Sequence, residues 1–113
     1  MFKIEAIIRS QKLESVQAAL EELQVSGITV TEVRGSGRQK GYTHTYRGSQ
    51  YTLSLTPRVK VEVIVTREQL QEAVDTVVSA AATGEVGDGK VFVVPVVEAV
   101  RIRTGEKGDL AIS

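Results

Sequence analysis

Cysteine and tryptophan are absent from this chain of 113 residues, and histidine occurs once, as His44. Without cysteine, neither a disulfide nor a thiolate metal site can form, and this composition fits a reducing cytoplasm. Without a second histidine, neither a nucleophile–base pair nor a zinc site can be built from the usual side chains. Aromatic residues make up only 4% of the chain, too few for base-stacking platforms. The sequence therefore points away from a dedicated enzyme and towards a ligand-binding module.

Net charge and long apolar runs are also missing. The formal net charge is zero, which removes any bulk attraction to nucleic acid or to an acidic membrane. No apolar run approaches the roughly 18 residues of a membrane span, and the opening Met1–Glu5 has no signal-peptide layout. We therefore expect one globular domain, residues 1–113, that works in the cytoplasm without direct contact with nucleic acid.

Acidic residues are absent from one long segment, 34–60, although it holds Arg and Lys residues throughout. Its cations are Arg34, Arg38, Lys40, Arg47, Arg58 and Lys60. Few strong core residues occur between Gly35 and Pro57, so the sequence predicts a long loop there. Loops of this length in compact domains are usually functional or disordered. The basic composition fits either a solvated loop or a surface for anions or for an acidic partner.

The rest of the chain shows the same pattern of elements twice. The pattern predicts strands at 2–9, 28–33, 59–65 and 91–97, and helices at 12–23 and 68–82. Pro95 indicates an edge, an irregularity or a strand end. Two β-α-β halves predict an α+β, ferredoxin-like fold, with an antiparallel sheet and both helices on one face. Association with further subunits would cover the other face.

Two glycine-rich segments carry cations, Gly35–Gly41 and Thr83–Lys90. Glycine lets backbone N–H groups crowd around an anion, and Lys or Arg neutralises its charge. The second segment lacks the Ser or Thr of a P-loop and follows a helix, and the first misses the dinucleotide-binding spacing by one residue. Arg101 and Arg103 would share one face of an extended segment and could fork onto phosphate oxygens. Together these features indicate a phosphate-bearing ligand, with a plain turn and a solvated strand face as the alternatives.

Six groups of residues form a recognisable combination: Lys3–Arg9, Thr29–Val33, Gly37–Gly41, Tyr46–Tyr51, Thr83–Gly84 with Gly87–Lys90, and Arg101–Glu106. Together they resemble the PII nitrogen-regulatory signal proteins over nearly the whole chain. The resemblance implies a homotrimer of ferredoxin-like subunits. It also implies a T-loop at about 37–55, a B-loop at about 83–90 and a C-loop at about 101–107.

The resemblance implies that ATP and ADP compete for clefts between subunits, and that Mg²⁺ bridges ATP to 2-oxoglutarate. The implied nucleotide-binding residues are Thr29, Gly35, Gly37, Arg38, Glu62, Ile64, Thr83, Gly87, Asp88, Gly89, Lys90, Arg101 and Arg103. The implied 2-oxoglutarate residues are Gln39, Lys40, Gly41 and Arg58, with Gln39 also the metal ligand. Tyr51 and Ser49 match positions that are modified in family members.

The implied mechanism is a shift in T-loop conformation and not a chemical reaction. The implied targets are ammonium channels and enzymes of nitrogen metabolism, so a membrane would be reached only through a channel partner. A slow ATPase that resets the switch is a further alternative, disfavoured because no obvious general base is present.

This chain departs from the usual PII pattern at several positions. Arg58 replaces the usual Lys and keeps the charge while changing its geometry. Two readings therefore stay open: a sensor of 2-oxoglutarate, or a PII-like sensor of another small anion such as bicarbonate, acting on carbon metabolism or a transporter. His44 and Gln50 replace the usual Glu residues, and Ser10, Gln11 and Leu55 also differ. The acid-free T-loop that results predicts an altered set of targets.

Overall fold

The structure is a computed structural model that describes residues 1–35, 43–46, 49–52 and 55–113, with side chains described outside 36–54. Its elements in chain order are β1 (Phe2–Ile8), η1 (Ser10–Lys12), α1 (Leu13–Glu22), β2 (Thr29–Gly35), β3 (Thr43–Tyr46), β4 (Ser49–Thr52), β5 (Thr56–Val65), α2 (Arg67–Ala81), β6 (Gly89–Pro95) and η2 (Gly108–Ile112).

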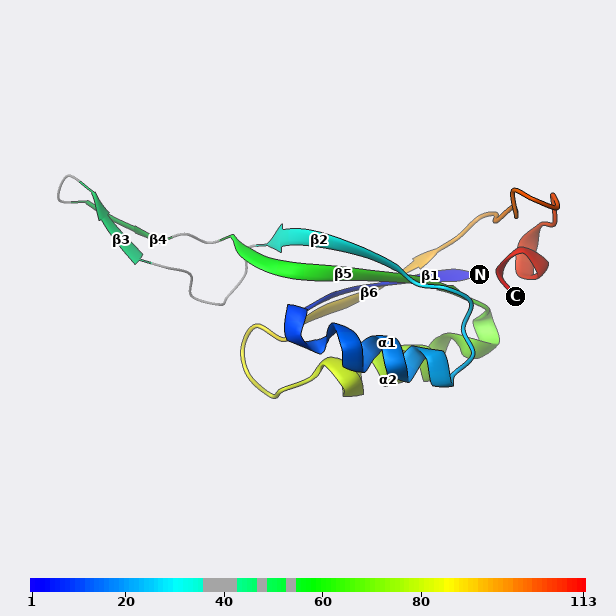
Figure 1. The fold of residues 1–113 in the computed structure, drawn as a ribbon, viewed down its shortest axis with the longest axis horizontal. Helices are drawn as coiled ribbons and strands as arrows, with labels where there is room; N and C mark the ends of the chain where they lie inside the picture. The colour runs from blue at the N-terminus through cyan, green and yellow to red at the C-terminus, as the bar shows by residue number, and fades with distance from the viewer. Residues whose placement is uncertain (36–42, 47–48, 53–54) are drawn as a thin grey trace.

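Four of the strands form one antiparallel sheet in the order β2-β5-β1-β6. Both α1 and α2 lie against the same face of this sheet (Figure 1). The two central strands pair from Phe2 opposite Val65 to Ile8 opposite Val59. The arrangement confirms the predicted ferredoxin-like fold, with one face of the sheet left open.

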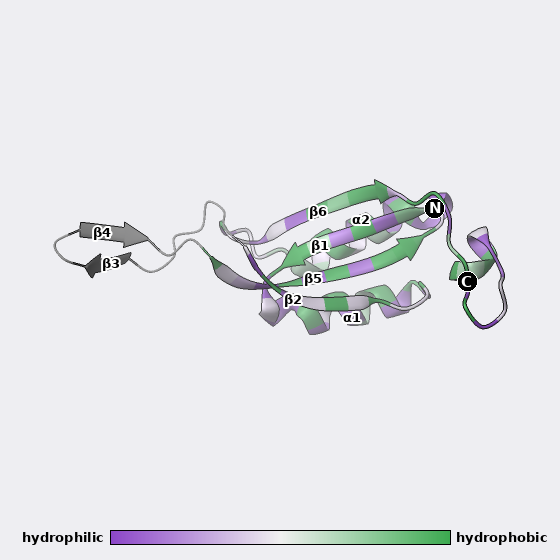
Figure 2. Cartoon of the chain, turned by 90° about the horizontal axis from the view of Figure 1, so that it is seen from above, coloured by the Kyte–Doolittle hydropathy of each residue, from purple (hydrophilic) through white to green (hydrophobic). Residues whose placement is uncertain are grey.

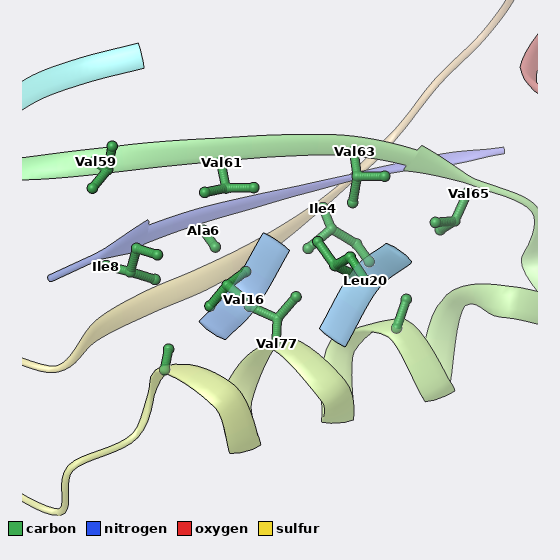
Figure 3. Close-up of a cluster of buried hydrophobic side chains, with 12 residues drawn as sticks. Ile4, Ala6, Ile8, Val16, Leu20, Val59, Val61, Val63, Val65 and Val77 are labelled. Atoms are coloured by element: carbon green, nitrogen blue, oxygen red, sulfur yellow. The ribbon is translucent and has the colours of Figure 1, made fainter. Parts of the chain in front are cut away.

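Strict alternation along the central strands creates the core. Ile4, Ala6 and Ile8 of β1 are at most 1% exposed and face the helices. The four alternate valines of β5 between Val59 and Val65 lie beside them, and α1 and α2 contribute Leu20 and Val77 (Figure 3). Each large side chain buried in this way stabilises the fold by about 1.5–3 kcal/mol. The core therefore lies between the helices and one face of the sheet.

The start of α2 is fixed by a capping box. The Thr66 hydroxyl accepts a hydrogen bond from the backbone N–H of Gln69 at 3.3 Å. In return, the Gln69 side chain accepts one from the backbone N–H of Thr66 at 3.0 Å. These reciprocal bonds satisfy N–H groups at the start of the helix, which begins at Arg67.

The prediction of a long loop between Gly35 and Pro57 is wrong in part. Thr43–Tyr46 and Ser49–Thr52 pair with each other as a two-stranded antiparallel sheet, and β5 already begins at Thr56 (Figure 1). Threonine and tyrosine favour extended backbone even where no alternating apolar face marks a strand. The predicted T-loop therefore contains a hairpin.

The sixth strand also begins earlier than expected, at Gly89 and not at residue 91. Its first residue pairs with Ile8 and its last, Pro95, pairs with Phe2. Pro95 thus lies at a strand end, one of the positions that the sequence indicated.

Candidate functional site

The segment between α2 and β6 is folded around the carboxylate of Asp88. One oxygen of this carboxylate accepts hydrogen bonds from the backbone N–H groups of Thr83 at 2.8 Å and Gly84 at 2.9 Å. The other accepts from the Thr83 hydroxyl and from Nε of Arg9, the latter at 3.1 Å. The bond from the Thr83 side chain is the main cause that holds the pKa of Asp88 well below its usual range. The ionised carboxylate therefore stabilises the conformation of the loop.

Gly89 fixes the other end of this loop against β1. A Cβ atom built at Gly89 would lie 1.7 Å from the carbonyl oxygen of Ile7, and φ at Gly89 is +101°. No other residue fits such a close backbone approach at positive φ. The loop therefore enters β6 at a point that only glycine permits.

A positive region surrounds the Asp88 carboxylate at this end of the sheet. Arg9 follows β1, and Arg58 lies on β5 one residue before Val59, which pairs with Ile8. Burial is the first cause that lowers the pKa of Arg58, and the charge of Arg9 is the second. Two guanidinium groups near one carboxylate leave an excess positive charge, which suits an anionic ligand.

Arg9 was given no role from the sequence, although it is part of this region. Its partner Asp88 is 79 residues further along the chain, so no local spacing connects them. The one available signal was a cation directly after a strand whose end meets the glycine-rich loop.

A hollow of about 340 Å³ lies on β2, β5 and the turn before β2. Its lining brings together Thr29, Glu62 and Ile64, three of the predicted nucleotide-binding residues. Lys3 also lines the hollow, and its ammonium lies 3.1 Å from the Glu62 carboxylate, the pairing that is the main cause raising the pKa of Lys3. An apolar side chain beside hydroxyl and carboxylate groups can pack on a flat ring and hydrogen-bond to a sugar or an amine.

A larger hollow of about 780 Å³ lies on the outer side of the helices. Its lining includes Glu68, Glu72 and Asp75, and none of the predicted site residues. Three carboxylates repel phosphate, so this hollow is the wrong place for the anionic ligand that the sequence indicates.

Arg101 and Arg103 do not share one face of an extended segment, and that expectation was wrong. The backbone N–H of Gly105 donates to the carbonyl of Arg101 at 2.7 Å and closes a turn, in which Gly105 has a φ of +75°. The Arg101 guanidinium donates to Glu106 at 2.6 Å and to the carbonyls of Leu110 and Ser113. Arg103 is exposed. The turn that Gly105 permits at positive φ replaces the extended segment that the sequence pattern predicted.

The B-loop and the C-loop lie at opposite ends of the sheet (Figure 1). The B-loop leads into Gly89, which pairs with Ile8, whereas the C-loop follows Pro95, which pairs with Phe2. Within one chain, the structure therefore brings Thr83, Asp88 and Gly89 together with Arg58, and keeps Arg101 and Arg103 away from them.

Several predicted residues lie outside this description. Gly37, Arg38, Gln39, Lys40 and Gly41 fall outside the described residues, and of Ser49 and Tyr51 only the backbone, in β4, is described. Across residues 1–35 and 55–113 and the two short strands, no cluster of three potential metal-ligating side chains is found. None of the described helices is long and apolar enough to cross a membrane.

Fold and site together define a small α+β domain, with charged loops at both ends of a ferredoxin-like sheet. Residues 1–106 match the family described as Nitrogen regulatory protein P-II, and the chain belongs to this family. The family consists of regulatory signal transducers and not of enzymes; its members bind small effectors, contact target proteins and form oligomers. The predicted family, fold class and nitrogen-regulatory role are therefore confirmed.

The relatives are similar along nearly their whole length. Nitrogen regulatory protein P-II of Azospirillum brasilense is 54% identical over 112 residues, covering 99% of this chain and all of the relative. Nitrogen regulatory protein P-II 1 of Escherichia coli K12 is 50% identical with the same coverage. The crystal structure of Arabidopsis thaliana PII bound to citrate superposes with a TM-score of 0.79 at 36% identity, covering 97% of this chain and 90% of that one.

Proposed function

We propose that this protein is a homotrimeric sensor of ATP, ADP and 2-oxoglutarate that regulates nitrogen-metabolism targets through the conformation of its T-loop. The observation that carries the proposal is the hollow that unites Thr29, Glu62 and Ile64 on the sheet whose one end bears the B-loop. Adenosine fits the mixed lining of that hollow. Ile64 pairs with Lys3 near the end of the sheet opposite the B-loop, so the triphosphate would extend towards Lys90 and the backbone N–H groups of a neighbouring subunit's B-loop.

The open face of the sheet supports assembly with further copies. Figure 2 shows the open face, with β6 beside β1 and β1 beside β5. Phe92 and Val94 of β6 are 49% and 40% exposed and pair with Glu5 and Lys3 of β1, whose charges are half-buried. Apolar side chains exposed next to internally paired charges are typical of a surface that another subunit covers. Because the B-loop and the C-loop lie at opposite ends, one phosphate group contacted by both needs two chains. The exposed Arg103 of one subunit would then reach the B-loop of its neighbour.

Arg58 supports a carboxylate effector at the same end of the sheet. Arg58 and Arg9 leave an excess positive charge around Asp88, which suits a dianion. A related PII of Arabidopsis thaliana has been crystallised with citrate, an anion that carries carboxylates. Magnesium, held by Gln39 in the predicted scheme, would join the effector to ATP by coordinating oxygens of both. Sensing of bicarbonate is the second candidate, because a small anion also suits two cations.

We place the regulated targets, an ammonium channel or enzymes of nitrogen metabolism, in contact with the T-loop in the cytoplasm. Uridylylation at Tyr51 or phosphorylation at Ser49 would add negative charge to a loop without acidic residues. Either modification would change which partner surface the loop attracts.

Isothermal titration calorimetry tests the ligands in order. ATP and ADP should each release heat on the wild type, and 2-oxoglutarate should do so only when Mg²⁺ and ATP are present. Lys90→Gln should weaken ATP binding by about tenfold through loss of one charge contact. Arg67→Gln is the matched control, because Arg67 lies over the ring of Phe2 at the opposite end of the sheet from the B-loop.

The outcomes separate the candidates. Heat from bicarbonate and none from 2-oxoglutarate would replace the first candidate with the second. No heat from either adenine nucleotide at millimolar concentration would contradict both.

A further inference from the structure

The B-loop is joined to the sheet by Arg9 as well as by Gly89. The Arg9 side chain is only 14% exposed, and its Nε donates to the Asp88 carboxylate at 3.1 Å. A second guanidinium nitrogen of Arg9 donates to the carbonyl oxygen of Val86 at 2.9 Å. One side chain at the end of β1 thus grips both the backbone and the central carboxylate of the loop.

The remaining bonds of the Asp88 carboxylate lie within the loop itself. They come from the backbone and hydroxyl of Thr83 and from the backbone of Gly84. These bonds give the loop its internal shape, whereas the bond from Arg9 connects that shape to β1. Charge-assisted bonds of this kind are stronger than neutral ones and carry directional information.

We infer that Arg9 is a positioning residue, which holds the B-loop through Asp88 in the orientation that binds phosphate. This inference rests on the proposed nucleotide site. Backbone N–H groups bind an anion best when they are already aligned, because no ordering cost is then paid on binding. Arg9 acts on the phosphate through the carboxylate, and the adenosine end of the ligand, at Thr29 and Ile64, is independent of it.

The alternative role for Arg9 is a direct charge contribution to the ligand. In that case removing Arg9 would weaken ATP binding whether or not the Asp88 carboxylate is present. If Arg9 acts through Asp88, removing Arg9 has little further effect once the carboxylate has been neutralised. A double-mutant cycle separates the two roles.

The experiment compares Arg9→Gln, Asp88→Asn and the double variant by calorimetry with ATP and with adenosine. Arg9→Gln should weaken ATP binding by about tenfold and leave adenosine binding unchanged, and in the Asp88→Asn background its effect on ATP should fall below about twofold. Arg67→Gln, which removes an equal charge away from the loop, should match the wild type. Equal losses with and without the Asp88 carboxylate, or equal losses for ATP and adenosine, would overturn the inference.

Hydrogen exchange without nucleotide tests the positioning by itself. Arg9→Gln should speed amide exchange at residues 83–89 and leave α1 and β5 unchanged, and unchanged exchange in the loop would overturn the inference. The two proposals fail separately. If the wild-type protein binds no nucleotide, the proposed nucleotide sensor is refuted. If the wild type binds ATP and Arg9→Gln binds it equally tightly, only the role of Arg9 is refuted.

Discussion

The two faces of the central sheet are made from alternate residues of the same strands, yet they have different tasks. On β1, Ile4 and Ile8 face the helices and are each 1% exposed. The residues on either side of Ile4, Lys3 and Glu5, lie on the open face with side chains 30% and 26% exposed. The covered face therefore specifies the fold, and the open face is left for ligands and other subunits.

The charges of the open face are paired with one another. Lys3 lies 3.1 Å from Glu62, and Lys60 lies 3.8 Å from Glu5. Half-buried pairs on a face that water reaches contribute little to stability. A ligand in the hollow beside Glu62 could therefore rearrange these ion pairs at a small cost in free energy. The same rearrangement among the buried side chains of the covered face would cost more.

The difference between the two faces should change the free energy of unfolding most at two adjacent isoleucines, Ile7 and Ile8. Ile8→Ala removes a side chain that is 1% exposed and should lower the free energy of unfolding by about 4 kcal/mol, through lost burial and a cavity. Ile7→Ala, on the open face of the same strand, should cost less than half as much. Urea denaturation at one fixed protein concentration measures both, because assembly makes stability concentration-dependent. Equal losses would break the distinction between the faces.

A smaller effect is expected where the loop meets the sheet. Gly89→Ala places a Cβ against the carbonyl of Ile7 and should cost about 3 kcal/mol, because backbone must shift. Gly84→Ala, in the same loop, has a φ of +88° but nothing within 4 Å of the new Cβ, so it should cost only about 1 kcal/mol. Thermal unfolding of the two variants should show this order, and a reversal would mean that β6 does not approach β1 as closely as described.

The smallest effect is expected from a charge on the open face. The pKa of Lys3 is raised above 10.5, chiefly by its hydrogen bond with Glu62. A raised pKa means that the stabilisation is fully present below pH 10.5 and is lost as the pH rises through the higher folded value. The wild type should therefore lose its slight advantage over Lys3→Met only in that alkaline range, as followed by thermal unfolding against pH. A difference that grows towards acid pH would contradict the pairing.

The sequence predicted those features that depend on local pattern. Alternation through the valines of β5 located that strand and its buried face, and the helical spacing located α2 to within one residue. The hairpin of β3 and β4 was missed because its threonines and tyrosines show no alternating apolar face. The pairing of Thr43–Tyr46 with Ser49–Thr52 defines these strands.

The site was predicted less completely because it depends on contacts between distant residues. Thr29, Glu62 and Ile64 could be grouped only through a family resemblance, and their shared hollow follows from the pairing of β2 with β5. The bond between Arg9 and Asp88 spans 79 residues and left no local signal. The turn at Arg101 depends on Glu106 and Gly105, which the extended pattern did not anticipate.

Native mass spectrometry of the wild-type protein, with and without Mg²⁺ and ATP, tests the central claim most directly. The account predicts a trimer that takes up as many as three nucleotides, because each site needs the B-loop of one chain and the C-loop of the next. A monomer that binds nucleotide, or a trimer that binds none, would contradict it.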